Sequence, residues 1–272
     1  MIEVRIHGRG GQGAVTANEM LAEAVYHDGK WSQAIPMYGT ERRGAPVTAF
    51  LRVDSVRVRE RDLVHEPDIV MCLDPLLSKR QTIVNGIKPG GLAVLNYPYP
   101  ADQVPVGGNF KLAVVDATKI ALETMNRPIT NTAMLGAFAK ISGIVRMESV
   151  EKAVMHRFPG RVGEMNIAAV RRSYEEVSPL VPAKPEPVKD EEGMGGGGGY
   201  GVIRSAAGWR VFRPVIDYDK CINCKTCWSY CPETAISWVD NKPQIDYRVC
   251  KGCGICPQEC PVKAIEYKRE IV

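Results

Sequence analysis

Eight of the nine cysteines lie between positions 221 and 260, and they form two copies of one pattern. Each copy has the spacing Cys-x2-Cys-x2-Cys-x3-Cys-Pro, and the second follows the first at an offset of 29 residues. The flanking sequence repeats as well, since Ile216-Asp217-Tyr218 recurs as Ile245-Asp246-Tyr247. The repeat predicts a domain with a pseudo-two-fold axis, in which each half has one ligand loop, short flanking strands and a helical turn.

This spacing is typical of proteins that bind two [4Fe–4S] clusters in the manner of bacterial ferredoxins. Thiolate is a soft ligand for iron, and gaps of two residues let one loop reach three corners of a cubane cluster. The fourth cysteine of each run, followed by proline, then binds the other cluster. We therefore expect one cluster on Cys221, Cys224, Cys227 and Cys260, and a second on Cys250, Cys253, Cys256 and Cys231.

Structural zinc and disulfide bonds are the alternatives for these cysteines. Zinc usually takes two-cysteine knuckles separated by a longer gap, and disulfides are unusual in a protein that stays in the cytosol. With cysteine as every ligand, a low reduction potential is favoured. Trp228 and Tyr230, which stand between ligands, are expected to shield the clusters by packing rather than to carry electrons. The ninth cysteine, Cys72, is expected to be a small buried side chain in an apolar run.

The cysteine array belongs to a C-terminal segment, residues 209–272, that is too short to be stable on an apolar core alone. Before it, residues 179–208 contain four prolines, a charged run and the five consecutive glycines from Gly195 to Gly199. Such a segment cannot build a core, so we expect a linker that is either a passive tether or a strap over the domain surface. Residues 1–178 form the other predicted domain.

Strand-like and helix-like segments alternate in residues 1–178. Residues 2–6 predict a strand and residues 14–27 a helix, while residues 47–53 and 56–58 look like a hairpin. The apolar runs 69–73, 92–95 and 112–115 are typical of strands covered on both faces, and helical patterns dominate residues 118–177. We expect a three-layer α/β domain with a mostly parallel, Rossmann-like sheet, followed by a small α+β two-cluster bacterial ferredoxin domain.

A glycine loop, Gly8-Arg9-Gly10-Gly11-Gln12-Gly13, lies between the first strand and the first helix. It fits G-x-G-x-x-G, so its glycines either bind an anion or only allow a tight turn. A nicotinamide site also needs an acidic residue at the end of the second strand. Asp28 precedes that strand and Glu41 comes too late, so NAD binding is disfavoured. His7 beside the loop is expected to be structural rather than an acid or base.

A second polar segment, residues 38–46, reads Tyr-Gly-Thr-Glu-Arg-Arg-Gly-Ala-Pro and contains Arg43. Three charges among small residues in a loop exceed what a solvated turn needs. Because rigid scaffolds often present sites on loops, we expect a functional or interface role here.

Charge composition and the length of the apolar runs argue against two classes of function, nucleic-acid binding and membrane insertion. Lys and Arg exceed Asp and Glu only by 35 to 31, and no basic stripe is present, so nucleic acid is not an expected partner. The longest apolar runs are far shorter than the roughly 18 residues of a membrane span, which argues against membrane insertion. Met1 leads directly into a strand-like segment with no signal-peptide pattern, so we expect a cytoplasmic location.

Taken together, the motifs of both parts resemble 2-oxoacid:ferredoxin oxidoreductases, the family that includes pyruvate synthase. The glycine loop, Tyr38-Gly39-x-Glu41-x-Arg43-Gly44 and Asn131-x-x-Met134-Leu135-Gly136-Ala137 resemble the gamma subunit. The segment Trp209-Arg210-x-Phe212-Arg213-Pro214 and the cysteine array resemble the delta subunit. The chain therefore looks like a gamma–delta fusion, and the resemblance covers nearly all of it apart from the linker.

The resemblance implies a subunit that is inactive alone and has no catalytic residues of its own. In the family, alpha and beta partner subunits hold thiamine diphosphate and Mg²⁺, and this sequence agrees because it lacks G-D-G followed by Asn-Asn. The implied function is to relay electrons from oxidation of a 2-oxoacid, most commonly pyruvate, through two clusters to external ferredoxin. Coenzyme A is the implied acyl acceptor, and the candidates for its contact or for the active-site wall are Gly8, Gly10, Gly11, Gly13 and Arg43.

Two other functions stay open at this point. An NAD(P)-linked reductase would feed its own ferredoxin domain from the Rossmann-like domain, although the missing ribose-binding acid argues against it. A ferredoxin-type carrier would use the N-terminal domain only to dock to a complex.

Overall fold

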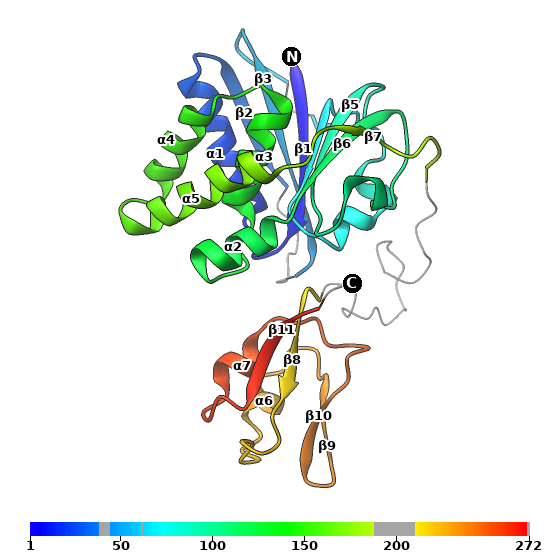
Figure 1. The fold of residues 1–272 in the computed structure, drawn as a ribbon, viewed down its shortest axis with the longest axis vertical. Helices are drawn as coiled ribbons and strands as arrows, with labels where there is room; N and C mark the ends of the chain where they lie inside the picture. Colours follow the sequence, from blue (N-terminus) through cyan, green and yellow to red (C-terminus); the bar gives the residue numbers. More distant parts are fainter. Residues whose placement is uncertain (38–43, 61, 188–209, 271–272) are drawn as a thin grey trace. The chain divides into compact units, whose positions relative to one another are not determined.

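The computed structural model describes residues 1–37, 44–60, 62–187 and 210–270 (Figure 1). The chain divides into two compact units, residues 1–190 and 191–272. Arg43, Trp209 and the glycine run of the predicted linker lie outside the described residues. Within the described ranges, the helices are either too short or too polar to cross a bilayer.

A seven-stranded sheet forms the centre of the N-terminal unit, in the order β2-β3-β1-β4-β5-β6-β7. β1, β4, β5 and β6 are parallel neighbours, β3 runs antiparallel between β1 and β2, and β7 runs antiparallel to β6. Most strands therefore point the same way, as the sequence predicted. The strands are β1 Ile2–Arg9, β2 Trp31–Pro36, β3 Pro46–Asp54, β4 Ile69–Cys72, β5 Gly91–Asn96, β6 Phe110–Val115 and β7 Val181–Pro182.

The two faces of this sheet are covered differently. The α-helices gather over one face (Figure 1), where they share a core with Val94 and Ala113. Ala93 and Leu95 point the other way, into a second core that includes Leu77 and Ile83 of short 3-10 turns. The central strands are thus buried on both faces, as their apolar runs predicted. The helices are α1 Ala14–His27, α2 Ala117–Met125, α3 Asn131–Ser142, α4 Met147–Arg157 and α5 Arg161–Glu176.

The expected hairpin between residues 47–53 and 56–58 is wrong. Residues 46–54 form the single strand β3, and residues 56–58 are not in a strand. β3 pairs with β1 along one edge, Ile2 opposite Val53, and with β2 along the other, Trp31 opposite Asp54. Because both edges of β3 are occupied, residues 56–58 have no ladder to join. The hairpin partner of β3 is β2, which precedes it in the chain.

The first part of the proline-containing segment lies on the N-terminal unit. β7 pairs with Lys111 and Leu112 of β6, and Lys184 forms a bridge with Gly107. A Cβ atom on Gly107 would collide with the carbonyl oxygen of Glu186, so this segment passes close to the domain surface. Over residues 181–186, therefore, the segment is a strap rather than a free tether.

The C-terminal unit consists of two antiparallel strand pairs and two short helices. β8 (Phe212–Ile216) pairs with β11 (Ile265–Arg269), and β9 (Ile236–Val239) pairs with β10 (Lys242–Ile245). α6 (Thr226–Ser229) and α7 (Ile255–Glu259) follow the two ligand loops. An offset of 29 residues relates the two pairs, since Ile216 opposite Ile265 corresponds to Ile245 opposite Ile236. This is the pseudo-two-fold arrangement that the repeat predicted.

Candidate iron–sulfur centres

Four cysteines from distant parts of the array line one cavity of the C-terminal unit. Cys221, Cys224 and Cys227 come from the first loop and α6, whereas Cys260 directly follows α7. The space between the surrounding atoms is about 340 Å³, including its opening to solvent. The rest of the lining is largely apolar and includes Ile216, Trp238, Val262 and Ile265. We call this space the first cavity.

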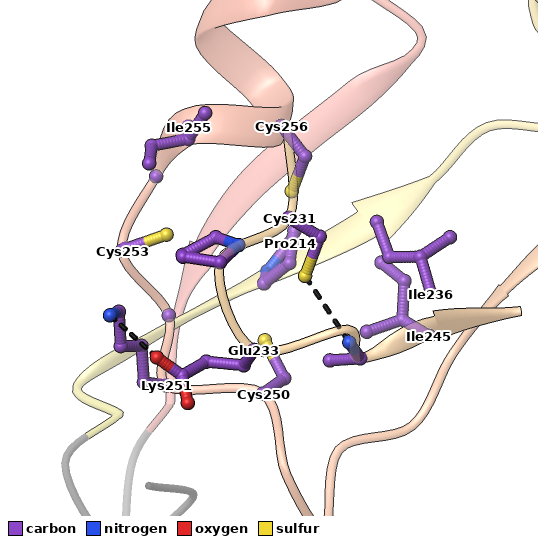
Figure 2. A pocket seen from close by; sticks show the side chains of 14 residues that line it. Pro214, Cys231, Glu233, Ile236, Ile245, Cys250, Lys251, Cys253, Ile255 and Cys256 are labelled. Atoms are coloured by element: carbon purple, nitrogen blue, oxygen red, sulfur yellow. Dashed lines mark hydrogen bonds and ion pairs between the residues drawn. The ribbon is translucent and has the colours of Figure 1, made fainter. Parts of the chain in front are cut away.

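The other four cysteines line a second cavity of about 360 Å³, measured in the same way. Figure 2 shows the sulfur atoms of Cys231, Cys250, Cys253 and Cys256 around one common space. Glu233 and Lys251 join the loops at this cavity through an ion pair of 2.6 Å, and the Lys251 side chain is nearly buried. Each cavity thus receives three cysteines from one run and the fourth from the other.

Matching hydrogen bonds show that the two halves share one backbone design. The hydroxyl of Tyr218 donates to the carbonyl oxygen of Pro243, and that of Tyr247 donates to Pro214. The crossing cysteines are matched too, because each accepts a backbone N–H at 3.2 Å four residues later. Left-handed backbone angles recur at the same offset, at Asn223 and Gly252, at Lys225 and Gly254, and at Thr234 and Lys263.

Burial opposes ionisation of the inward thiols. It raises the pKa of Cys256 to about 12, with neighbouring cysteines adding to the effect, and it also raises the pKa of Cys227 and Cys250. The more exposed Cys224 differs, since hydrogen bonds from Thr226 lower its pKa. Metals bind thiolate, so any metal centre assembled here must displace protons from the buried cysteines.

The donor set fits an iron–sulfur cluster better than a single ion. Within the described ranges, no three Cys, His, Asp or Glu side chains converge closely enough to hold one metal ion. Four thiols spread around a larger space instead suit a multi-iron group, whose corners lie apart. Trp238, which lines the first cavity, has a buried indole N–H that finds no acceptor among the residues described by the structure. Cluster sulfur would supply such an acceptor.

The expected shielding by Trp228 and Tyr230 is wrong. Their side chains are 51% and 57% exposed. Trp228 lies in the short helix α6 beside the inward Cys227, so the helix turns the indole outward. Trp238 lines the first cavity instead. Period-two alternation in β9, with Ile236 and Trp238 on one face, was the sequence signal that pointed to it.

In the N-terminal unit, the glycine loop joins β1 to α1 as predicted. Gly13 precedes α1 with a φ of 80°, a left-handed conformation that favours glycine. A Cβ atom on Gly13 would lie 2.6 Å from Asn131 Nδ2 of α3, and one on Gly8 would lie 3.1 Å from the Cβ of Ala14. Glycine at these positions lets β1, α1 and α3 approach closely.

The same loop contacts the segment that follows residue 43. The amide of Gly10 donates to the carbonyl oxygen of Ala45 at 2.8 Å, and the amide of Gly44 donates to Gly10 at 3.0 Å. The amide of Gln12 donates to Arg9. The two polar segments singled out in the sequence therefore meet at the carboxyl end of β1, although residues 38–43 themselves lie outside the described part of the chain.

A buried ion pair that the sequence did not reveal supports this loop. Arg9 Nε lies 3.2 Å from Asp74 Oδ2, and both side chains are buried. Gln12 donates its amide to the same carboxylate oxygen at 2.7 Å, while the other oxygen accepts the backbone amides of Leu76 and Leu77. Asp74 thus ties the glycine loop to the end of β4. Only the position of Asp74 after an apolar run hinted at this role.

His7 and Cys72 both have structural roles. Desolvation, assisted by the charge of Arg5, lowers the pKa of His7 to about 3, so its neutral ring accepts a hydrogen bond from Arg5. Burial raises the pKa of Cys72 to about 12, and its side chain is fully inaccessible. Neither residue is placed to act as an acid, base or nucleophile.

The strand order also bears on the nicotinamide alternative. β3 separates β2 from β1, so the end of β2 does not lie beside the glycine loop. Asp28 has another role, since its carboxylate accepts hydrogen bonds from Arg146 and Ser149 at the start of α4. Within the described ranges, therefore, no acidic side chain takes the place of the ribose-binding acid of a Rossmann NAD site.

An α/β unit combined with paired four-cysteine cavities is typical of an iron–sulfur protein that also has a separate α/β domain. Residues 3–176 match the family described as pyruvate ferredoxin/flavodoxin oxidoreductase, and residues 214–267 match the 4Fe-4S dicluster domain. The chain belongs to the pyruvate ferredoxin/flavodoxin oxidoreductase family. Its N-terminal unit is of the gamma-subunit type, and its C-terminal unit is an iron–sulfur domain.

Individual relatives agree with this assignment. The pyruvate synthase subunit PorC of Methanothermobacter thermautotrophicus is 51% identical over 180 residues, which cover 66% of this chain and 98% of the relative. The common gamma subunit of pyruvate/ketoisovalerate oxidoreductases of Pyrococcus furiosus is 50% identical, with 65% and 97% covered. A crystal structure of pyruvate oxidoreductase subunit PORC from Thermotoga maritima has a TM-score of 0.59 and 42% identity, with 65% and 97% covered. These relatives are subunits of larger oxidoreductases, and about a third of this chain extends beyond the matched part.

Proposed function

We propose that this chain is the electron-relay subunit of a 2-oxoacid:ferredoxin oxidoreductase complex. Alpha and beta partner subunits would hold thiamine diphosphate and Mg²⁺ and oxidise the 2-oxoacid. Electrons would then pass one at a time through two [4Fe–4S] clusters in the C-terminal unit to external ferredoxin. The N-terminal unit would attach this relay to the partners.

The observation that carries the proposal is the division of eight cysteines between two cavities. We assign one cluster to Cys221, Cys224, Cys227 and Cys260, which line the first cavity, and the other to Cys231, Cys250, Cys253 and Cys256, which line the second. Because cysteines crossing between the runs tie the two sites together, the clusters would be close neighbours, which favours one-electron transfer between them.

Reconstitution tests the proposal. The purified chain should bind about eight irons, show two interacting [4Fe–4S] signals by electron paramagnetic resonance (EPR), and oxidise no 2-oxoacid alone. Adding the partner subunits should restore ferredoxin reduction. Catalysis by the isolated chain, or iron binding limited to one ion per site, would refute it.

Paired serine variants test the crossed ligation. Cys221→Ser with Cys260→Ser should disturb the same single cluster as either change alone, whereas Cys221→Ser with Cys231→Ser should disturb both. Cys72→Ser is the matched control, because Cys72 lies in the other unit and should leave both signals intact. A Cys221–Cys231 pair that disturbs only one cluster contradicts the assignment.

For the N-terminal unit, we propose that the glycine loop helps to wall the partners' active site and contacts coenzyme A. The support is its position at the carboxyl end of β1 and the start of α1, where phosphates bind in many α/β folds. We place Gly8, Gly10, Gly11, Gly13 and Arg43 in this contact. Gly11→Ala should raise the KM for coenzyme A in the complete complex and leave the KM for the 2-oxoacid unchanged. An unaltered KM for coenzyme A contradicts the contact.

Pyruvate is our proposed substrate. The Pyrococcus furiosus relative is named as a subunit common to pyruvate and ketoisovalerate oxidoreductases, which fits a gamma unit that does not select the 2-oxoacid. Exchanging the partner subunits, not this chain, should therefore change substrate preference in a reconstituted complex.

A further inference from the structure

A charged pair near the end of the chain is one difference between the two cavities, beside the Glu233–Lys251 pair at the second cavity, whose counterparts in the repeat are Val262 and Ile222. In the 29-residue repeat, Arg210 corresponds to Val239 and Glu270 corresponds to Asn241. Val239 is the last residue of β9 and Asn241 lies in the tight connection to β10, and neither side chain can form an ion pair. An asymmetry of charge is therefore built into a unit whose backbone is otherwise repeated.

Arg210 forms hydrogen bonds both with Glu270 and with the second ligand loop. Its Nε and Nη2 donate to both carboxylate oxygens of Glu270, at 2.6 and 3.0 Å. Its Nη1 points the other way and donates to the carbonyl oxygens of Tyr247 and Cys250, at 2.6 and 2.8 Å. A Cβ atom on Gly252 would lie 2.6 Å from the Arg210 Cγ, so the side chain lies directly on the loop that lines the second cavity.

This geometry places the positive charge of Arg210 on the side of the second cavity and the negative charge of Glu270 on the far side. The Arg210 side chain is only 10% exposed and that of Glu270 is 23% exposed, so solvent screens the pair weakly. The guanidinium is held on the loop side of the pair, with the carboxylate behind it. Positive charge beside a cluster stabilises its reduced, more negative state and raises its potential.

We propose that Arg210 and Glu270 set the reduction potential of the cluster bound by Cys231, Cys250, Cys253 and Cys256, and not that of its neighbour. Arg210 acts as a positioning and charge-setting residue, since it holds the ligand loop by the carbonyl groups of Tyr247 and Cys250. The inference rests on the cluster assignment of the proposed function.

EPR-monitored redox titration of the full, cluster-loaded chain tests the proposal. Arg210→Gln removes the positive charge and should lower the potential of one cluster, so that its reduced-to-oxidised ratio at a fixed potential falls roughly tenfold. Glu270→Gln removes the opposing charge and should raise the potential of the same cluster. Arg210→Lys keeps the charge and should stay close to the parent. If Arg210 and Glu270 had a purely structural role, the shift in reduction potential would not change sign between Arg210→Gln and Glu270→Gln.

Two further variants complete the experiment. Arg248→Gln removes one positive charge two residues from Cys250, but the Arg248 side chain is 89% exposed, so it should shift neither potential appreciably. Cys253→Ser identifies the EPR signal of the second cluster, whose reduction potential should be the one that changes.

Three outcomes would overturn the proposal: shifts in potential of the same sign in Arg210→Gln and Glu270→Gln, equal shifts of both clusters, or a shift no larger than in Arg248→Gln. If Arg210→Gln loses its clusters, Glu270→Gln and Arg210→Lys decide by the same criteria. A parent chain without two clusters refutes the proposed function itself.

Discussion

Replacing Asp74 by Asn should destabilise the N-terminal unit through the buried pair beneath the glycine loop. Asp74 is fully buried and Arg9 is 3% exposed, so the substitution removes a carboxylate from beside a buried guanidinium. Breaking a buried pair from one side costs about 3–5 kcal/mol. In the parent protein, Gln12 Nε2 donates a hydrogen bond to Asp74 Oδ2 at 2.7 Å. The Asn side chain must turn either its oxygen or its N–H toward this donor. We expect a loss of about 3 kcal/mol or more.

Urea unfolding monitored by hydrogen exchange of β1 and β4 amides measures this loss, because these strands report on the N-terminal unit alone. Arg9→Met with Asp74→Asn removes both charges and should cost less than the sum of the single changes, since the two side chains are in direct contact and their effects are coupled. Arg146→Gln is the control, as its guanidinium is 70% exposed and should cost less than about 1 kcal/mol. A cost below about 1 kcal/mol for Asp74→Asn, or additive costs in the double variant, refutes the reasoning.

Three further changes test other parts of the structure. Burial would raise the pKa of Asp28, but hydrogen bonds from Ser149 and Arg146 outweigh this effect and lower the pKa. Asp28→Asn should therefore reduce the free energy of unfolding by about 1.5–3 kcal/mol at pH 7. This difference should shrink as the pH falls below about 4, the pKa of Asp in the unfolded chain, and unfolding measured over a range of acid pH values would show it. Gly136→Ala in α3 places a Cβ atom against the Val170 carbonyl of α5 and should destabilise by about 1–3 kcal/mol, more than it gains in helix propensity, and a thermal melt no lower than the parent's contradicts this. Trp238→Phe removes the buried indole donor at the first cavity and should lower the potential of that cluster alone, measured by EPR titration against Trp228→Phe as the exposed control.

Local chemistry explains what the sequence could predict. The cysteine spacing is short-range and repeated, so it specified which four thiols line each cavity, and the apolar runs of β4, β5 and β6 specified strands buried on both faces. Register between distant strands is not local, and residues 47–58 show the consequence. An alternating pattern predicts that β3 is a strand, but it does not say that β1 and β2 occupy both of its edges.

The polar interior was harder to predict for the same reason. Arg9 and Asp74 are far apart in sequence, and nothing in either local segment says that the two ends of β1 and β4 bring them together. The position of Trp228 between ligands predicts that it shields a cluster, yet distance along the chain says little about the direction of a side chain. A residue next to an inward cysteine on a helix points outward, whereas alternation in β9 turns Trp238 inward.

Crossed ligation also bears on how the C-terminal unit is stabilised. Its small core contains Cys227, Cys256 and Cys260 alongside Ile236 and Ile265, so three of the eight proposed ligands are themselves core residues. Because each proposed cluster needs a cysteine from both runs, neither half can complete a site without the other. Removing iron should therefore unfold this unit cooperatively rather than one half at a time, while the N-terminal unit, which has its own two cores, stays folded. Hydrogen exchange of the chain after chelation measures this directly: rapid exchange confined to residues 210–270 is the expected result, and protection retained in either half alone contradicts the argument.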